Sequence, residues 1–145
     1  MAASIVPYPL AGRSLANAEV DLDSHTLKVM VVGSGYTPAL DTHRYKSDVG
    51  AEVAGTGYTA GGVTLTGVTV TYDAATNTVK FDAADADWPT AAGWTGRYGV
   101  VYDATPATDA TRPLLALVDF DGEVSPTAGF TIVWPAGGIL TIAAP

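Results

Sequence analysis

The stretch from Val63 to Phe81 decides the fold class of this chain. It reads Val63-Thr-Leu-Thr-Gly-Val-Thr-Val-Thr-Tyr72 and continues as Asp73-Ala-Ala-Thr-Asn-Thr-Val-Lys-Phe81. Threonines alternate with apolar residues, a glycine interrupts the run, and an Asp-to-Asn turn divides it, which is typical of β-strands with one wet face and one dry face. The pattern predicts an all-β protein, a single-domain antiparallel β-sandwich or small barrel with at most one or two short helices.

The alternation changes phase at Gly67. Val63 and Leu65 fall on one side of a strand, whereas Val70 and Tyr72 fall on the other. One regular strand cannot bury both sets in one core, because successive side chains point to opposite faces. We therefore expect a bulge or tight bend near Gly67, or a strand that passes from one core to another.

Two further segments carry structural predictions. After the turn, Val79 and Phe81 should return on the apolar face and pair with the strand before it. The run from Leu114 to Phe120 is almost continuously apolar, so we expect a central strand covered on both faces by the fold or by a neighbouring subunit, with Leu115 and Leu117 buried.

One of the short helices is expected at residues 41–49, the only segment with modest helical potential. Residues 41–49 have modest helical potential and predict one short helix or a compact turn that starts near a cap at Asp41 or Thr42.

Residues 1–18 predict an extended N-terminal arm ahead of a β-domain at 19–145. Pro7 and Pro9 disfavour helix there, and the small side chains offer little core. The arm is either a loose terminus or edge strand, or a segment that docks on a neighbour.

Composition excludes several classes of function. Seven Lys and Arg against fifteen Asp and Glu give a net charge of −8, and the basic residues are scattered, so we expect no nucleic-acid partner. The chain has no cysteine, which excludes disulfides and thiolate metal sites. No apolar stretch approaches the roughly 20 residues that cross a bilayer, and no basic segment opens the chain, so we expect no membrane partner and folding in a cytoplasm.

The sequence offers no convincing catalytic set. The only histidines are His25 and His43, each in a polar, turn-like segment, and no Gly-x-Ser-x-Gly signature is present. A histidine at the surface or bonded to local backbone is the better interpretation of each. We expect a protein that is not an enzyme, with no catalytic residues.

Metal and cofactor sites are likewise not expected. Asp119, Asp121 and Glu123 are the best candidates for a cation, but their spacing does not match a complete calcium loop. Asp21, Asp23 and the 82–87 run are weaker still. The paired glycines are turn residues, because no glycine-rich segment leads into a clear helix as phosphate sites require.

Large aromatic residues could build a sugar-binding platform, although core packing is the stronger interpretation. We expect Trp94 to be the exposed one, and joint exposure of Trp88 and Trp94 would favour the platform. The set is Trp88, Trp94, Tyr98, Tyr102, Phe120, Phe130 and Trp134.

Several motifs resemble a family of small structural proteins encoded by tailed bacteriophages, often near the head genes. They span most of the chain from Asp21 to Ile142 and include Asp23-Ser-His-Thr-Leu-Lys-Val, Tyr36-Thr-Pro, Glu52-Val-Ala-Gly-Thr-Gly-Tyr-Thr-Ala-Gly-Gly, Val70-Thr-Tyr-Asp-Ala-Ala-Thr-Asn-Thr-Val-Lys-Phe, Arg97-Tyr-Gly-Val-Val-Tyr-Asp, Pro113-Leu-Leu-Ala-Leu-Val-Asp-Phe and Gly138-Ile-Leu-Thr-Ile. The resemblance implies a virion component and brings no catalytic residues. Residues 1–18 and the 88–94 segment depart from the pattern.

These observations lead to one main functional hypothesis and two alternatives. The first is a non-enzymatic capsid decoration or cement protein that stabilises a phage head on its outer surface, with the major capsid protein as partner and a homo-oligomer, preferably a trimer, as its state. The second is a tail or fibre module that binds a host surface glycan. The third is a hydrolase, which the missing triad disfavours.

Overall fold

Two long strands at the centre of the largest sheet carry most of the apolar core. The computed structural model describes residues 3–143. Its largest sheet is antiparallel and runs in the order β1-β8-β7-β2-β3. Its strands are β1 (Ser4–Pro7), β8 (Leu114–Val124), β7 (Gly96–Asp103), β2 (Leu27–Val32) and β3 (Val63–Thr64).

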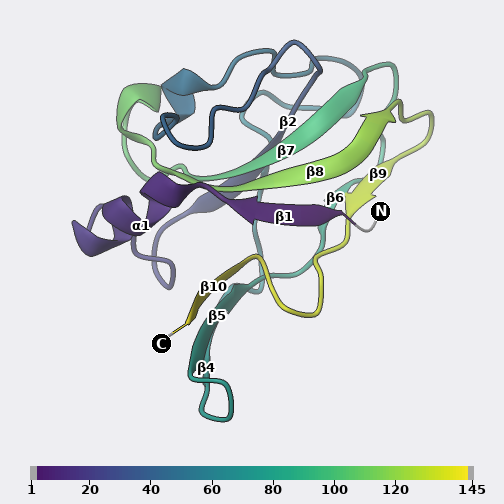
Figure 1. Cartoon of the computed structure of the whole chain (residues 1–145). Helices are drawn as coiled ribbons and strands as arrows, with labels where there is room; N and C mark the ends of the chain where they lie inside the picture. The colour runs from purple at the N-terminus through teal and green to yellow at the C-terminus, as the bar shows by residue number, and fades with distance from the viewer. Residues whose placement is uncertain (1–2, 144–145) are drawn as a thin grey trace.

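Two smaller antiparallel sheets complete the fold (Figure 1). One pairs β6 (Ala86–Trp88) with β9 (Phe130–Ile132), and the other has the order β10-β5-β4, with β10 (Leu140–Ala143), β5 (Thr78–Asp82) and β4 (Thr69–Asp73). Ile132 of β9 packs at the point where Gly99 of β7 meets Val118 of β8, which sets one layer on the other. The all-β, sandwich-like fold is therefore confirmed, and within residues 3–143 no sheet closes into a barrel.

The central strand is buried as expected. Every residue from Leu114 to Val118 is buried, with Leu115 0% and Leu117 5% exposed. Side chains alternate between the two faces of the strand, so both faces are covered, and the fold itself supplies the cover.

Gly67 ends one sheet and begins another. β3 belongs to the large sheet and β4 to the small one, and Gly67 lies between them with φ +59°. Leu65 is buried on the body side of this turn, at 6% exposure. The expected phase change is confirmed, because the two halves of the alternating run face different layers.

The N-terminal segment confirms one interpretation of the arm and corrects another: β1 is the edge strand that the sequence left open, but the expected extended chain is wrong for Pro9–Ala16. Residues Pro9–Ala16 form helix α1, with proline in its first turn, where a missing N–H leaves no hydrogen bond unmade. β1 pairs with β8 at the edge of the sheet. Tyr8, which connects β1 to α1, is 1% exposed. The prolines thus mark the strand end and the helix start, which the sequence interpretation took as signs of extended chain; residues 1–2 lie outside the described residues.

The expected turn at 41–49 is present as a hydrogen-bonded turn at residues 40–42 and a 3₁₀ helix, η1 (Lys46–Asp48). The cap lies at Tyr45 and not at Asp41 or Thr42, because the Asp48 carboxylate accepts the backbone N–H groups of Arg44 and Tyr45 at 2.8 and 3.0 Å. A second 3₁₀ helix, η2, spans Asp109–Thr111. Within residues 3–143 no helix combines the length and the apolar character needed to span a bilayer.

We expect the N-terminal segment to stabilise the sandwich. Tyr8→Ala removes a ring that is 1% exposed and should lower the free energy of unfolding by about 3 kcal/mol. The matched control is Val6→Ala, two residues earlier and 37% exposed, which should change it by less than about 1 kcal/mol. Chemical denaturation measures both, and a Tyr8→Ala protein as stable as the wild type would show that the segment is not part of the core.

The Gly61-Gly62 turn allows no side chain at its second position. A Cβ atom on Gly62, at φ +80°, would lie 1.9 Å from the carbonyl oxygen of Val29. Gly62→Ala should therefore prevent soluble expression or remove the folded state. Gly12→Ala in α1, where nothing lies within 4 Å, should instead raise stability by about 0.5–1 kcal/mol; equal melting temperatures for the two variants would contradict this account.

Candidate functional site

The sheet β10-β5-β4 projects from the body (Figure 1). One of its two faces is apolar. Its strand register places Leu140, Phe81 and Val70 in one cross-strand row and Ile142, Val79 and Tyr72 in the next. The row near the body is largely covered, with Phe81 1% and Leu140 6% exposed. The outer row is open, with Tyr72 63% and Ile142 49% exposed.

We name the four exposed or half-buried members of this surface, Val70, Tyr72, Val79 and Ile142, the apolar sheet face. Large contiguous apolar patches are uncommon on the surfaces of monomers and mark interaction surfaces. The pairing of Val70 with Phe81 and of Tyr72 with Val79 is as the sequence predicted. The sequence interpretation missed that no element of the described chain covers the outer half of this face.

A groove next to the apolar sheet face continues it toward α1. The groove has a volume of about 490 Å³ and is lined by Leu15, Val20, Leu22 and Val70, with Ala18, Asp21, Asp23 and His25 around them. We call it the helix-side groove. Its floor is apolar and its rim carries two carboxylates, so an apolar or aromatic side chain with a polar tip fits it best.

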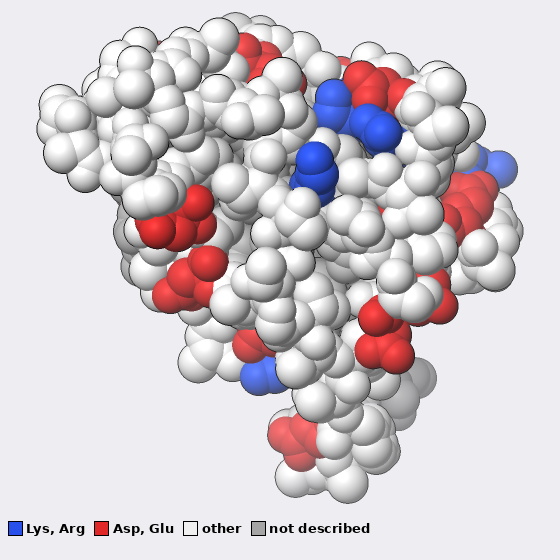
Figure 2. Space-filling model, turned by 180° about the vertical axis from the view of Figure 1, so that it is seen from behind, with Lys and Arg blue, Asp and Glu red and all other residues white. Residues whose placement is uncertain are grey.

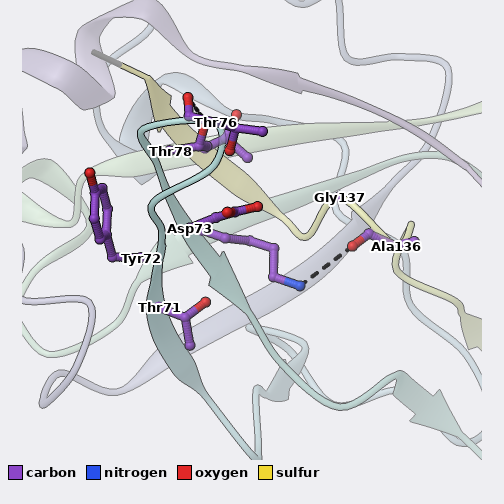
Figure 3. A pocket seen from close by; sticks show the side chains of 9 residues that line it. Thr71, Tyr72, Asp73, Thr76, Thr78, Ala136 and Gly137 are labelled. Carbon is purple, nitrogen blue, oxygen red and sulfur yellow. Dashed lines mark hydrogen bonds between the residues drawn. The ribbon is translucent and has the colours of Figure 1, made fainter.

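The opposite face of the same sheet is polar. Thr71, Lys80 and Thr141 form one cross-strand row, and Asp73 and Thr78 form another. Figure 3 shows these side chains around a groove of about 410 Å³, with Lys80 Nζ 3.4 Å from the carbonyl oxygen of Ala136 and the ring of Tyr72 pointing away.

His25 is part of a buried pair. Its Nδ1 lies 2.6 Å from Oδ2 of Asp103, a carboxylate with no exposed surface, while the His25 side chain is 28% exposed. Oδ1 of Asp103 accepts the backbone N–H of Thr105 at 2.9 Å. The pair anchors the start of β2 to the end of β7. Among the described residues, no serine or threonine hydroxyl is hydrogen-bonded to the His25 ring, so the pair does not activate a nucleophile.

His43 stacks on Tyr36 and bonds to it, with Nδ1 2.8 Å from the Tyr36 hydroxyl. That hydroxyl lies 3.0 Å from the hydroxyl of Tyr8, and burial raises the pKa of Tyr8 and of Tyr36 above the ordinary value. The chain of bonds ties α1 and its preceding strand to the 36–43 loop. Nδ1 of His43 also accepts the backbone N–H of Ala39 at 3.3 Å, which agrees with the local-backbone interpretation. Nδ1 of His25 faces the Asp103 carboxylate, so the main partner of His25 is distant in sequence and not its local backbone.

The acidic candidates do not converge. Asp119 binds the guanidinium of Arg97, which lowers the pKa of the Asp119 carboxyl, and it also accepts the N–H of Asp121 at 2.8 Å. A register shift between β7 and β8 bulges the chain here, and Asp121 takes φ +57°. Across residues 3–143 no three His, Asp or Glu side chains gather closely enough to hold a metal ion.

The expectation that Trp94 is exposed is wrong. Trp94 is 5% and Trp88 2% exposed, because both pack against Phe130, with ring centroids 5.6 and 5.8 Å from it. Tyr58 and Phe120 complete the cluster. The two indoles therefore fill the space between the sheets and leave no joint platform for a sugar ring.

One further polar cluster closes the 52–62 loop. Glu52 accepts the Tyr58 hydroxyl at 2.8 Å and the Gly61 N–H at 2.6 Å, and Tyr102 donates to the Gly61 carbonyl at 2.7 Å. Burial raises the pKa of Tyr102 to about 12 and also raises the pKa of Tyr58, so both hydroxyls stay protonated and act as donors. The cluster holds the turn in which Gly62 approaches β2.

The surface is acidic and its cations are largely neutralised. Among the described residues, 3–143, five of the seven Lys and Arg form ion pairs: Arg44, Lys46, Lys80, Arg97 and Arg112. Figure 2 shows carboxylates spread over the body and the projecting part, with several of the few cations beside them. A partner with positive surface charge suits this distribution.

Comparisons of the chain with protein-family models, with curated proteins and with solved structures found no match.

We expect His25 to stabilise the fold by compensating Asp103. His25→Ala leaves a fully buried carboxylate without its ring partner and should lower the free energy of unfolding by about 2–3 kcal/mol. The double variant with Asp103→Asn should be more stable than the sum of the single effects predicts, by at least about 1 kcal/mol. Strict additivity in urea denaturation would contradict the pairing.

Proposed function

We propose that this chain is a non-enzymatic structural protein of a tailed-phage virion, a decoration or cement protein that stabilises the head. In this proposal it sits on the outer capsid surface, binds the major capsid protein and forms a homo-oligomer, for which three-fold lattice positions favour a trimer. It is made and assembled in the host cytoplasm.

The observation that carries the proposal is the apolar sheet face. Tyr72 and Ile142 lie on a projecting sheet, held by a rigid sandwich, and expose 63% and 49% of their surface. Burying such residues against a partner releases about 25 cal/mol per Å² of apolar surface, so the face gains stability only in an assembly. The motifs that resemble head-associated phage proteins, among them 70–81, include this face.

The docked N-terminal segment moves the proposed attachment point. Docking of the arm on a neighbour is one of the two interpretations that the sequence allows, but Tyr8 and Ala11 are 1% and 2% exposed in the chain's own core. Truncating it would damage the fold before it changed attachment. The projecting sheet is the better candidate, because it already exposes apolar surface.

Binding of a host glycan by a tail or fibre module is the second candidate. Its support is the groove of about 410 Å³ on the polar face, where threonine hydroxyls, Asp73 and Lys80 could hydrogen-bond a sugar. Lys80→Ala should then weaken saccharide binding measured by calorimetry, with Thr64→Ala on β3 as control.

The main proposal is tested on heads and tails separated from the virions of the encoding phage. Mass spectrometry should find the chain with heads. Added to heads that lack it, Ile142→Asp protein should show about tenfold lower occupancy than wild type, because a charge replaces an apolar contact. Thr141→Asp, on the opposite face of the same strand, is the matched control.

Two outcomes would contradict the proposal. The chain could be present only in tails, or folded Ile142→Asp protein could occupy heads as fully as wild type does.

A further inference from the structure

Strand β4 is an open edge. It pairs with β5 on one side, no strand of the described chain pairs on its other side, and all five residues from Thr69 to Asp73 are exposed. In an antiparallel ladder alternate residues direct their N–H and C=O groups to opposite sides, so part of β4 presents unpaired groups to solvent. Such an edge is a template for another strand.

The sequence of β4 is complementary to itself. If two copies pair antiparallel about Thr71, Thr71 faces Thr71, Val70 faces Tyr72 of the second copy, and Thr69 faces Asp73 of the second copy. The two-fold axis is normal to the sheet, so both apolar faces lie on one side. Threonine pairs and aromatic–β-branched pairs are favourable across strands, and no like charges stand opposite each other.

The helix-side groove lies where this pairing would place an aromatic ring. Val70 lines the groove together with Leu15, Val20 and Leu22. In the two-fold arrangement, Tyr72 of the second copy is the direct cross-strand neighbour of Val70, at the side of this groove. Tyr72 is 63% exposed in the single chain, and an exposed aromatic facing an apolar pocket is the usual anchor of an interface. The contact occurs twice by symmetry.

We propose that two copies of this chain associate through β4, pairing antiparallel about Thr71 to form a continuous six-stranded sheet with the order β10-β5-β4-β4-β5-β10. This inference does not depend on a phage origin. The contact joins two chains only, so it is separate from a three-fold contact in a trimer.

The expected affinity is modest. One strand pair with two anchors is smaller than the roughly 1,600 Å² of a standard interface, so we expect micromolar dissociation. Each chain carries a net charge of −8, so added salt should tighten the association by screening the repulsion.

A charge-swap experiment tests both the partner and the register. Thr71→Glu places two carboxylates opposite each other at the axis, and Thr71→Lys places two ammonium groups there. Each variant alone should form a dimer whose dissociation constant, measured by sedimentation equilibrium, is about tenfold higher than that of the wild type. An equimolar mixture should regain wild-type association, because Glu then faces Lys. Thr141→Glu and Thr141→Lys, on the same face but on β10, are the matched controls and should behave as wild type.

A thiol experiment checks the geometry without relying on affinity. The chain has no cysteine, so Thr71→Cys introduces one exposed thiol. Directly opposed residues have Cα atoms about 4.5–5.5 Å apart, within the range a disulfide spans. Mild oxidation should cross-link Thr71→Cys at least about tenfold faster than Thr141→Cys.

The proposal is overturned if wild-type protein is monomeric at hundreds of micromolar in high salt. It is also overturned if the mixed Thr71 variants fail to recover association, or if the two cysteine variants cross-link at equal rates. A monomer that pairs its β4 edge with a different protein would give the first of these results.

Discussion

The turn at Gly67 is the constraint on which the arrangement of this molecule depends. Upstream of it, Val63 and Leu65 face the main core, and downstream of it the strand pairs in another sheet. The backbone takes φ +59° there, a conformation that glycine adopts without the steric penalty of a Cβ. Because the chain leaves the large sheet at this point, the hairpin that follows projects from the body.

Gly67 also explains why one apolar row is covered and the next is open. Phe81 and Leu140 lie close enough to the body to be buried, at 1% and 6% exposure, and they fix the base of the projecting sheet. Val79 and Ile142 lie two residues away from Phe81 and Leu140 in their strands, on the side away from the body, and the body does not cover this row. The same alternation that builds a core near the body therefore builds a surface away from it, with no change in residue type.

Local pattern predicted much of the fold, and failed where tertiary context decides. The burial of Leu117 and the break at Gly67 follow from periodicity alone. The helix after Pro9 was missed because proline at a helix start and proline in an extended arm look alike in sequence. Trp94 was misplaced because its neighbours Ala92 and Gly93 suggest a loop, whereas Phe130, distant in sequence, covers its ring.

The candidate site was predictable in composition but not in exposure. The sequence indicates that Val70 and Tyr72 share an apolar face, and only the structure places that face outside the core. Propensity and periodicity show which side chains are apolar and share a face, so that their burial is favourable. They do not show which other element of the fold covers that face. A hairpin whose dry face is left open is therefore the feature that sequence reasoning assigns to a core by default.

The open edge, β4, also carries Val70 and Tyr72 of the apolar sheet face, and this overlap links the two proposals. Pairing about Thr71 would satisfy the edge of β4 and place the apolar faces of two chains side by side. The stripe would then run Ile142, Val79, Tyr72 in one chain and Val70, Phe81, Leu140 in the other. A capsid lattice offers two-fold as well as three-fold relations between neighbours, so a two-fold strand contact and a three-fold contact could serve one assembly. Weak pairing in solution suits that role, because many copies held on one surface gain from each other's local concentration, while free chains stay separate until they attach.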